Sequence, residues 1–183
     1  MTKCIMLIRH AEKPRAGAQG VDGSGRHDEQ ALSVAGWKRA GALVPYFAAP
    51  AGAIHGYPLC RPHHIYAARR TARHPSTRPR DTVQELADFL SITVDERWSD
   101  SDPVQHIALH LKSHDQPVLV SWRHDVLPML GRAIAGDAAV PARWPDDRFD
   151  LTWVFRPGAG GWQLLQLPQR LLAGDRNEVL CCD

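Results

Sequence analysis

The sequence lacks any apolar run long enough to cross a bilayer as a helix. Its opening residues, MTKCIMLIRH, hold too short an apolar core for a secretory signal and no small-residue cleavage site. The four cysteines contain no Cys-x-x-Cys pair, so neither a disulfide framework nor a zinc site is indicated. From these absences we expect a cytoplasmic protein with no membrane segment.

An excess of charge of one sign is also missing, because 22 lysines and arginines are nearly balanced by 20 aspartates and glutamates. The net charge of +2 creates no global field toward nucleic acid or a membrane surface. Residues 61–80 are locally rich in arginine, but Tyr66 is the only aromatic residue there. The stretch therefore offers few side chains on which nucleic-acid bases could stack. This stretch therefore favours steering of an anionic substrate over binding of nucleic acid.

Apolar strand-like runs alternate with amphipathic helix-like runs along the 183 residues, without a repeat or a linker. Strands are predicted over 3–8, 63–68, 91–94 and 117–121, and helices over 31–47, 81–90, 103–113 and 126–136. Ser33 suits a helix cap, and Pro79 suits a first helical turn. Residues 149–155 and 162–167, with GAGG between them, predict a C-terminal β-hairpin. We expect one domain over 1–183, a three-layer α/β/α sandwich with a largely parallel central sheet.

Two of the apolar strands end in the same kind of residue. CIMLI is followed by Arg9 and His10, and PVLVS is followed by WRHD with His124. In open α/β sheets, ligands bind beyond the carboxyl ends of the strands. Both histidines are therefore expected at one binding edge of the sheet.

Four motifs occur in an order that resembles the histidine phosphatase superfamily, also called phosphoglycerate-mutase-like. IRHAE resembles the family's RHG motif, and LSVAGWKRA resembles the helix start LTxxGxxQA. STRPRDTVQELA resembles the second motif, S-x-x-R-x-x-Q/E-T-A. VLVSWRHD resembles the strand end that carries the family's second histidine. Ala11 replaces the usual glycine of RHG, and Trp122 and Arg123 lengthen the approach to His124. The mutase signature RHGxSxWN is absent, because EKP follows the first motif, and this disfavours a mutase.

The resemblance implies a role for each matching residue. His10 would be the nucleophile that forms a phosphohistidine, and Arg9, Arg78 and His124 would bind the transferred phosphoryl group. Guanidinium groups match phosphate oxygens in bidentate geometry, and nearby cations keep an imidazole neutral and nucleophilic. No metal or other cofactor is implied, and the expected partner is a small phosphorylated substrate.

The general acid that protonates the leaving oxygen has several candidates. Asp125 follows His124 directly, as in the acid phosphatase and phytase branch of the superfamily, and we assign the acid to Asp125. In the other branch a carboxylate comes from the loop after the second motif, which here offers Glu96, Asp100 and Asp102. Asp125 is equally suited to cap the helix predicted after it.

Three further histidines, His106, His110 and His114, recur at helical spacing in VQHIALHLKSH. Imidazoles on one helix face can bind a metal, but no carboxylate or cysteine completes a ligand set here. We therefore expect a solvated stripe opposite Ile107 and Leu111.

The sequence thus predicts a metal-independent phosphatase that hydrolyses a phosphomonoester through a phosphohistidine on His10. Two alternatives remain. One is a phosphoprotein (phosphohistidine) phosphatase of the same fold, and the other is a non-catalytic domain that binds a phosphate ligand or nucleic acid. The sequence specifies neither the identity of the substrate nor the oligomeric state.

Overall fold

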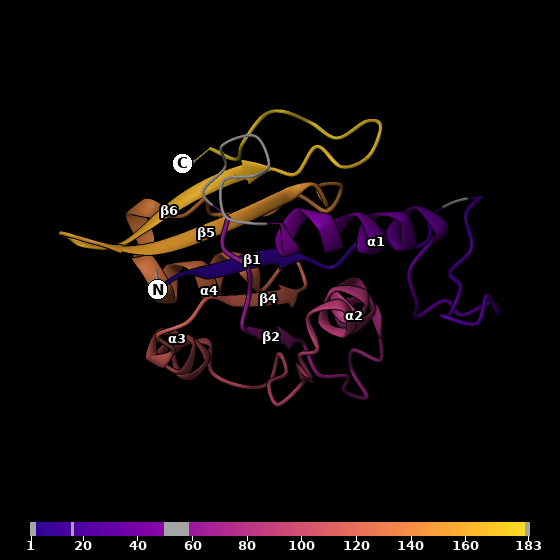
Figure 1. Cartoon of the computed structure of the whole chain (residues 1–183), viewed down its shortest axis with the longest axis horizontal. Coiled ribbons are helices and arrows are strands. Elements are labelled where there is room, and N and C mark those ends of the chain that lie inside the picture. Colours follow the sequence, from indigo (N-terminus) through magenta and orange to yellow (C-terminus); the bar gives the residue numbers. More distant parts are fainter. Residues whose placement is uncertain (1–2, 16, 50–58, 182–183) are drawn as a thin grey trace.

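A computed structural model describes residues 3–15, 17–49 and 59–181, which form a sheet and the helices that cover it (Figure 1). The elements in chain order are β1 (Ile5–Arg9), α1 (Val34–Ala48), β2 (His64–Ala67), α2 (Arg78–Leu90), β3 (Val94–Asp95), α3 (Val104–Ser113), β4 (Val118–Trp122), α4 (Leu127–Ala135), a 3₁₀ turn (Asp137–Ala139), β5 (Leu151–Gly158) and β6 (Gly161–Pro168). The strands lie in the order β3-β2-β4-β1-β5-β6.

The sheet is parallel on one side of β1 and antiparallel on the other. β1, β4, β2 and β3 pair in parallel, whereas β5 runs antiparallel to β1, and β6 completes a hairpin with β5. The predicted α/β class, the largely parallel sheet and the C-terminal hairpin are therefore confirmed. In the β1–β4 ladder Arg9 pairs with Trp122, so these two strands end level with each other.

Alternate residues of β1 enter two different apolar cores. Ile5 and Leu7 join a cluster that includes residues of α3 and α4. Met6 and Ile8 join a second cluster with residues of α1 and α2. β1 is thus buried on both faces, which is why its sequence is an unbroken apolar run rather than an alternating one.

The start of α1 is attached to the chain that follows β1. The Gly36 N–H donates to Ser33 Oγ at 3.2 Å, which confirms the predicted cap, and the Ser33 hydroxyl donates to the Glu12 carbonyl at 3.0 Å. A Cβ on Gly36 would lie 2.5 Å from the Glu12 carbonyl oxygen, so only glycine allows this approach. The helix end and the segment after His10 are therefore held together.

The prediction for the strand at residues 91–94 is wrong in extent, because β3 contains only Val94 and Asp95. Ser91 caps α2 in the left-handed region at φ 57°, and its N–H donates to the carbonyls of Ala87 and Asp88. Residues 91–93 therefore connect the end of α2 to β3 and are not part of the strand. At its other end α2 begins at Arg78, three residues earlier than predicted.

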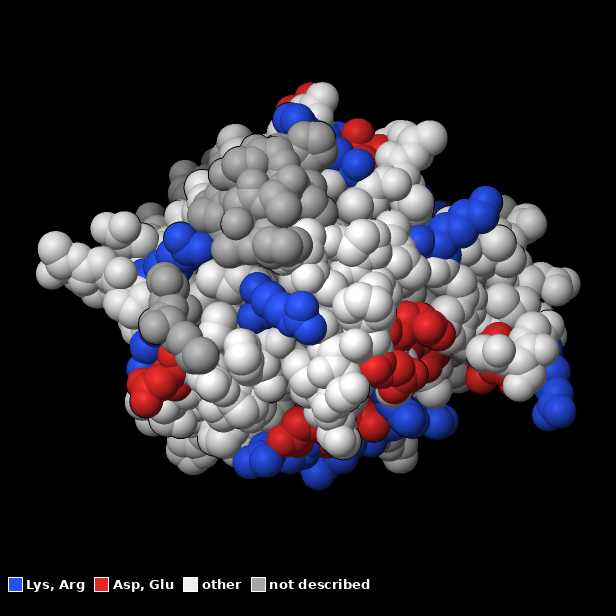
Figure 2. All heavy atoms as spheres, viewed as in Figure 1, with Lys and Arg blue, Asp and Glu red and all other residues white. Residues whose placement is uncertain are grey.

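The visible surface mixes charges of both signs. Figure 2 shows acidic and basic side chains next to each other along the lower edge of one face, as the small net charge suggests. This edge therefore offers no extended surface of one sign. Within residues 3–15, 17–49 and 59–181 no helix combines the length and the apolarity that a membrane crossing needs.

Candidate active site

The carboxyl ends of β1 and β4 bring the two strand-end histidines to one edge of the sheet. The His10 N–H donates to the Trp122 carbonyl at 2.8 Å, which extends the pairing of the two strands by one residue. His124 follows Trp122 by two residues. The structure thus places His10 and His124 at the edge where the sequence led us to expect them.

His10 is a buried imidazole whose tautomer is fixed by one contact. Its Nδ1 lies 2.8 Å from the Ala11 carbonyl oxygen, which can only accept, so Nδ1 donates and Nε2 carries the lone pair. Burial, followed by the positive charge of Arg9 and of the nearby Arg78 and His124, lowers the pKa of His10 to about 3. His10 is therefore neutral near pH 7, and Nε2 makes no hydrogen bond within the described chain.

Arg9 is a fully buried cation held by the segment before β5. Its guanidinium carbon lies 3.9 Å from the centre of the Phe149 ring. Nη1 donates to the carbonyls of Pro145 (3.2 Å) and Arg148 (3.3 Å), and Nη2 donates to Asp146 Oδ1 at 3.1 Å. Burial lowers the pKa of Arg9 to about 10, so the group stays charged, and its buried Nε has no partner among the described residues.

Arg78 approaches from the first turn of α2. Its Nε donates to the Ala31 carbonyl at 2.9 Å, and Nη2 donates to the Glu29 carbonyl. Thr82 connects this turn to the first motif, because its hydroxyl donates to the Arg78 carbonyl at 2.7 Å and accepts the Ala11 N–H at 2.8 Å. Burial lowers the pKa of Arg78.

His124 stands at the wall of an open cavity of about 550 Å³. The lining consists of His124, Asp125, Pro128, Ala142, Arg143, Trp144, Pro145 and Asp146. Burial lowers the pKa of His124, and the charge of Arg9 lowers it further. The cavity gives the second histidine access to solvent, whereas His10 is only 5% exposed.

Asp125 lines the same cavity and forms an ion pair with Arg123. The guanidinium donates to the two carboxylate oxygens at 3.1 Å and 2.8 Å. Partial burial works to raise the pKa of Asp125, but the hydrogen bond from Arg123 and the charge of His124 outweigh it, and the pKa is lowered. The alternative role as a helix cap is wrong, because α4 is capped by Val126 and receives no side-chain cap bond.

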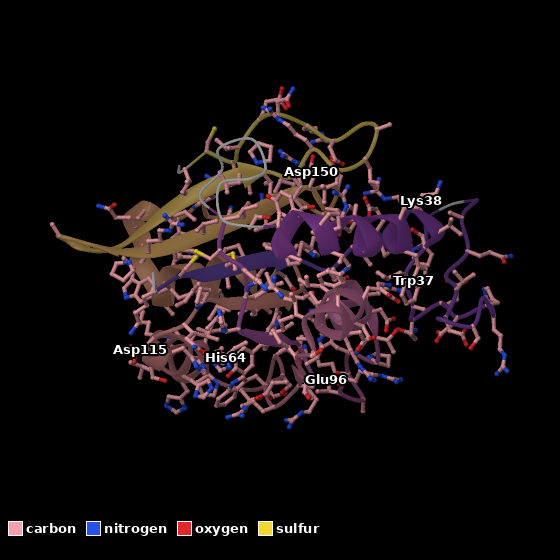
Figure 3. All side chains as sticks on the ribbon, in the orientation of Figure 1. Trp37, Lys38, His64, Glu96, Asp115 and Asp150 are labelled. Carbon is pink, nitrogen blue, oxygen red and sulfur yellow. The ribbon has the colours of Figure 1, made fainter. Side chains whose placement is uncertain are left out.

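The three other candidate acids are engaged elsewhere. Glu96 lies 3.7 Å from Arg80 on the lower edge of the molecule (Figure 3). Asp100 pairs with His74 at 2.8 Å. Asp102 accepts the N–H and the hydroxyl of Ser99, at 2.7 Å and 2.8 Å. Within the described chain none of the three carboxylates contacts His10 or His124.

The carboxylate that does contact the site is Asp146, which the sequence analysis missed. Asp146 Oδ1 lies 2.8 Å from Lys13 Nζ, 3.1 Å from Arg9 Nη2 and 3.6 Å from His124 Nε2. The hydrogen bond from Lys13 lowers the pKa of Asp146 despite partial burial, so a carboxylate anion lies among three cationic or polar groups. No local pattern pointed to it, since Arg9 and Asp146 are 137 residues apart in sequence.

The second group of histidines lies beside α3 and β2. His106 is exposed, but the Nε2 atoms of His110 and His114 both lie 2.9 Å from the Tyr66 hydroxyl, and the His64 and His114 rings are 4.2 Å apart. The prediction of a solvated stripe is therefore wrong for His110 and His114, which pack onto Tyr66. Among residues 3–15, 17–49 and 59–181, no group of three or more histidine, cysteine, aspartate or glutamate side chains is arranged to hold a metal ion.

Comparison with known proteins adds evidence on the fold. No protein-family profile matches the sequence, and no curated protein matches it either. Among solved structures, the protein histidine phosphatase SixA complexed with tungstate is 12% identical, with a TM-score of 0.57 over 91% of this chain and 97% of that one. Mycobacterial hydrolase 1 is 11% identical, with a TM-score of 0.53 over 90% and 97%. The chain has the fold of the histidine phosphatases, and the resemblance predicted from its motifs is confirmed at that level.

Proposed function

We propose that this protein is a phosphatase that hydrolyses a phosphomonoester through a phosphohistidine on Nε2 of His10. The observation that carries the proposal is the hydrogen bond of 2.8 Å between Nδ1 and the Ala11 carbonyl. It directs the lone pair to Nε2, and the lowered pKa keeps that lone pair free of a proton near neutral pH. A neutral, fixed imidazole is what attack on phosphorus requires.

The reaction has two steps. Nε2 of His10 attacks phosphorus, the bond to the ester oxygen breaks, and the leaving oxygen takes a proton. Water then attacks the phosphohistidine, the N–P bond breaks, and inorganic phosphate leaves. Both steps spread negative charge over three equatorial oxygens, so positioned cations lower both barriers.

Arg9, Arg78 and His124 would bind the transferred phosphoryl group, and the two arginines would supply the positive charge. All three contribute to the electrostatic environment of His10, and Arg9 offers a buried Nε–H that has no partner among the described residues. A buried donor of this kind is expected to bond to a ligand or to water. Because guanidinium groups carry the charge, we propose that the reaction needs neither a metal nor another cofactor.

Asp125 is the general acid in this proposal, because it is adjacent to His124 and lines the same cavity. Its ion pair with Arg123 favours the carboxylate over the acid. Protonation of Asp125 therefore requires the pair to open when substrate binds. Leaving groups that depart without a proton would not depend on this step.

A phosphoprotein (phosphohistidine) phosphatase is the second candidate. The fold likeness to SixA, which is named as a protein histidine phosphatase, favours it. The cavity of about 550 Å³ beside His124 is open and would admit a side chain as well as a small phosphorylated molecule. The two candidates share the chemistry at His10 and differ in the group that leaves.

A cytoplasmic location remains a prediction from the sequence.

Hydrolysis of an aryl phosphate, measured before and after exhaustive chelation, tests the proposal. The expected result is turnover that chelation leaves unchanged and that is absent from His10→Ala. A folded wild-type protein without turnover would indicate a non-catalytic phosphate-binding domain. Turnover that falls on chelation and returns with zinc or magnesium would contradict the metal-independent mechanism. A panel of phosphorylated metabolites and a phosphohistidine peptide would then separate the two candidates.

A further inference from the structure

Two cysteines and an arginine meet at the amino-terminal end of β1, opposite the end that carries His10. Cys4 directly precedes β1, and Cys60 lies shortly before β2. In the antiparallel ladder Ile5 pairs with Phe155, and the next pair in the same register is Cys4 with Arg156. Three segments distant in sequence therefore converge on this point.

The two sulfur atoms and the guanidinium contact one another. Arg156 Nη2 donates to Cys60 Sγ at 3.4 Å. Cys4 and Cys60 belong to the same buried cluster and interact with each other, and Arg156 interacts with both sulfur atoms. Cys4 is 1% exposed and Cys60 8%, so the cluster is largely closed to solvent at Cys4 and slightly open at Cys60.

The contact with Arg156 distinguishes the two sulfur atoms, because the guanidinium donates to Cys60. The interaction with Cys4, together with the hydrogen bond and the charge of Arg156, lowers the pKa of Cys60 although burial opposes the shift. The interaction with Cys60, followed by burial, raises the pKa of Cys4. The cation therefore favours the thiolate form of Cys60, and burial favours the thiol form of Cys4. The thiolate is the reactive form of cysteine.

We propose that Cys60 and Cys4 form a peroxide-reactive pair that closes to a disulfide. The Cys60 thiolate attacks one oxygen of hydrogen peroxide, the S–O bond forms, the O–O bond breaks, and the departing hydroxide takes a proton to become water. Cys4 then loses its proton and attacks the Cys60 sulfur, the S–S bond forms, and the S–O bond breaks to release a second water. Two thiols are oxidised by two electrons, and one peroxide is reduced to two waters.

This site is separate from the proposed active site. Six residues of extended chain separate Cys4 from His10, a distance of roughly 20 Å at about 3.3 Å per residue. Peroxide therefore reacts here without contact with the phosphoryl site. The inference does not depend on the protein being a phosphatase, and its test does not use activity.

Mass spectrometry of the wild-type protein tests the proposal directly. After stoichiometric hydrogen peroxide, free thiols are alkylated and the protein is cut with trypsin. Trypsin does not cleave between Arg61 and Pro62, so Cys4 appears in residues 4–9, Cys60 in 40–69, and Cys181 with Cys182 in 177–183. The expected product is residues 4–9 linked to 40–69 with the loss of two hydrogens.

Matched variants separate the roles of the sulfur atoms and the cation. Cys4→Ser should leave Cys60 reactive but trap it as sulfenic acid, and Arg156→Gln should slow the reaction of Cys60 on the order of tenfold by reducing its thiolate fraction. Arg156→Lys keeps the charge and serves as the control. Circular dichroism checks that each variant is folded.

Three outcomes would overturn the proposal. The first is a Cys60 that stays reduced while Cys181 and Cys182 oxidise. The second is a Cys60 that oxidises to sulfinic acid without a link to Cys4 in the wild type. The third is an equal peroxide rate in wild type and in a folded Arg156→Gln.

Discussion

In the part of the chain that the structure describes, two groups of histidines differ in what their imidazoles face. At the carboxyl ends of β1 and β4, His10 and His124 lie near Arg9, and His124 also faces Asp146. Beside α3, the Nε2 atoms of His110 and His114 are within hydrogen-bond distance of the Tyr66 hydroxyl. Burial lowers the pKa of all four imidazoles, so a lowered pKa alone does not distinguish the groups.

Hydrogen-bond satisfaction does distinguish them. The Tyr66 hydroxyl can donate to one imidazole and accept from the other, so the Nε2 atoms of His110 and His114 are paired within the second group. In the first group, the hydrogen bond of the His10 ring is made by Nδ1 and leaves Nε2 available, and the buried Nε of Arg9 has no partner among the described residues. A site prepared for a ligand keeps such groups unpaired at a cost in stability, whereas a packing cluster does not. The difference predicts chemistry at the first group and none at the second.

The largest expected effect comes from His10. His10→Ala should lower the turnover of an aryl phosphate by on the order of 10⁴-fold or more, the scale seen when a nucleophile is removed. The matched control is His110→Ala, which removes an imidazole from the second group and should leave turnover within about twofold. Near-normal turnover of His10→Ala, or a comparable loss in His110→Ala, would contradict the division into two groups.

The next largest effect is expected at Arg78. Arg78→Ala should lower kcat/KM by on the order of 10²-fold, because a preorganised group that stabilises developing charge is lost. Arg78→Lys should rescue little, since a point charge does not reproduce two parallel N–H donors. Arg97→Ala is the control, because it removes a cation whose guanidinium carbon lies 6.0 Å from the centre of the Tyr66 ring in the second group. Equal values of kcat/KM for Arg78→Ala and wild type would contradict the proposed role of Arg78 in binding the phosphoryl group.

A smaller and selective effect is expected at Asp125. Asp125→Asn should slow alkyl phosphates by on the order of tenfold or more and leave aryl phosphates nearly unchanged, because an aryl leaving oxygen scarcely needs a proton. Asp146→Asn is the matched comparison, since Asp146 lines the same cavity and its Oδ1 lies 3.6 Å from His124 Nε2. A loss that depends on the leaving group in Asp146→Asn but not in Asp125→Asn would move the acid to Asp146.

The smallest effect concerns stability in acid. The pKa of His10 falls from an ordinary 6.5 to about 3 in the folded chain. Between pH 6.5 and pH 3 the unfolded chain therefore binds a proton at His10 that the folded chain does not bind. Stability is therefore present above pH 6.5 and is lost as the pH falls toward 3, by up to about 1.4 kcal/mol per pH unit. Folded His10→Gln should lose less free energy of unfolding between pH 7 and pH 5 than wild type does, as measured in urea. His106→Gln, at an exposed position, should behave as wild type.

Several parts of the fold were predictable because they depend on local pattern. β1 and β4 are buried on both faces, so they appear as unbroken apolar runs. The Ser33 cap is a local signal and was predicted. The start of β3 was predicted three residues too early, because Ser91 adopts the left-handed conformation at the end of α2 without being a glycine. Fold class therefore followed from the sequence, and the exact ends of short elements did not.

The site was predictable only where residues belong to a motif. Arg9, His10 and His124 follow strands whose ends meet in the parallel sheet, and the sequence alone placed them together. Asp146 reaches Arg9 across 137 residues from a segment without a pattern of its own, so only the folded chain reveals the contact. The packing of His114 against Tyr66, 48 residues away, escaped prediction for the same reason.

Rapid quenching is the direct test for a phosphoryl group covalently attached to His10. Wild-type protein is mixed with a ³²P-labelled phosphomonoester, quenched in alkali within the first turnover, and digested for mass spectrometry. The expected result is acid-labile, alkali-stable phosphate on His10 in the wild type and none in His10→Ala. Turnover of the wild type without label on His10, or label on His110 or His114 instead, would contradict it.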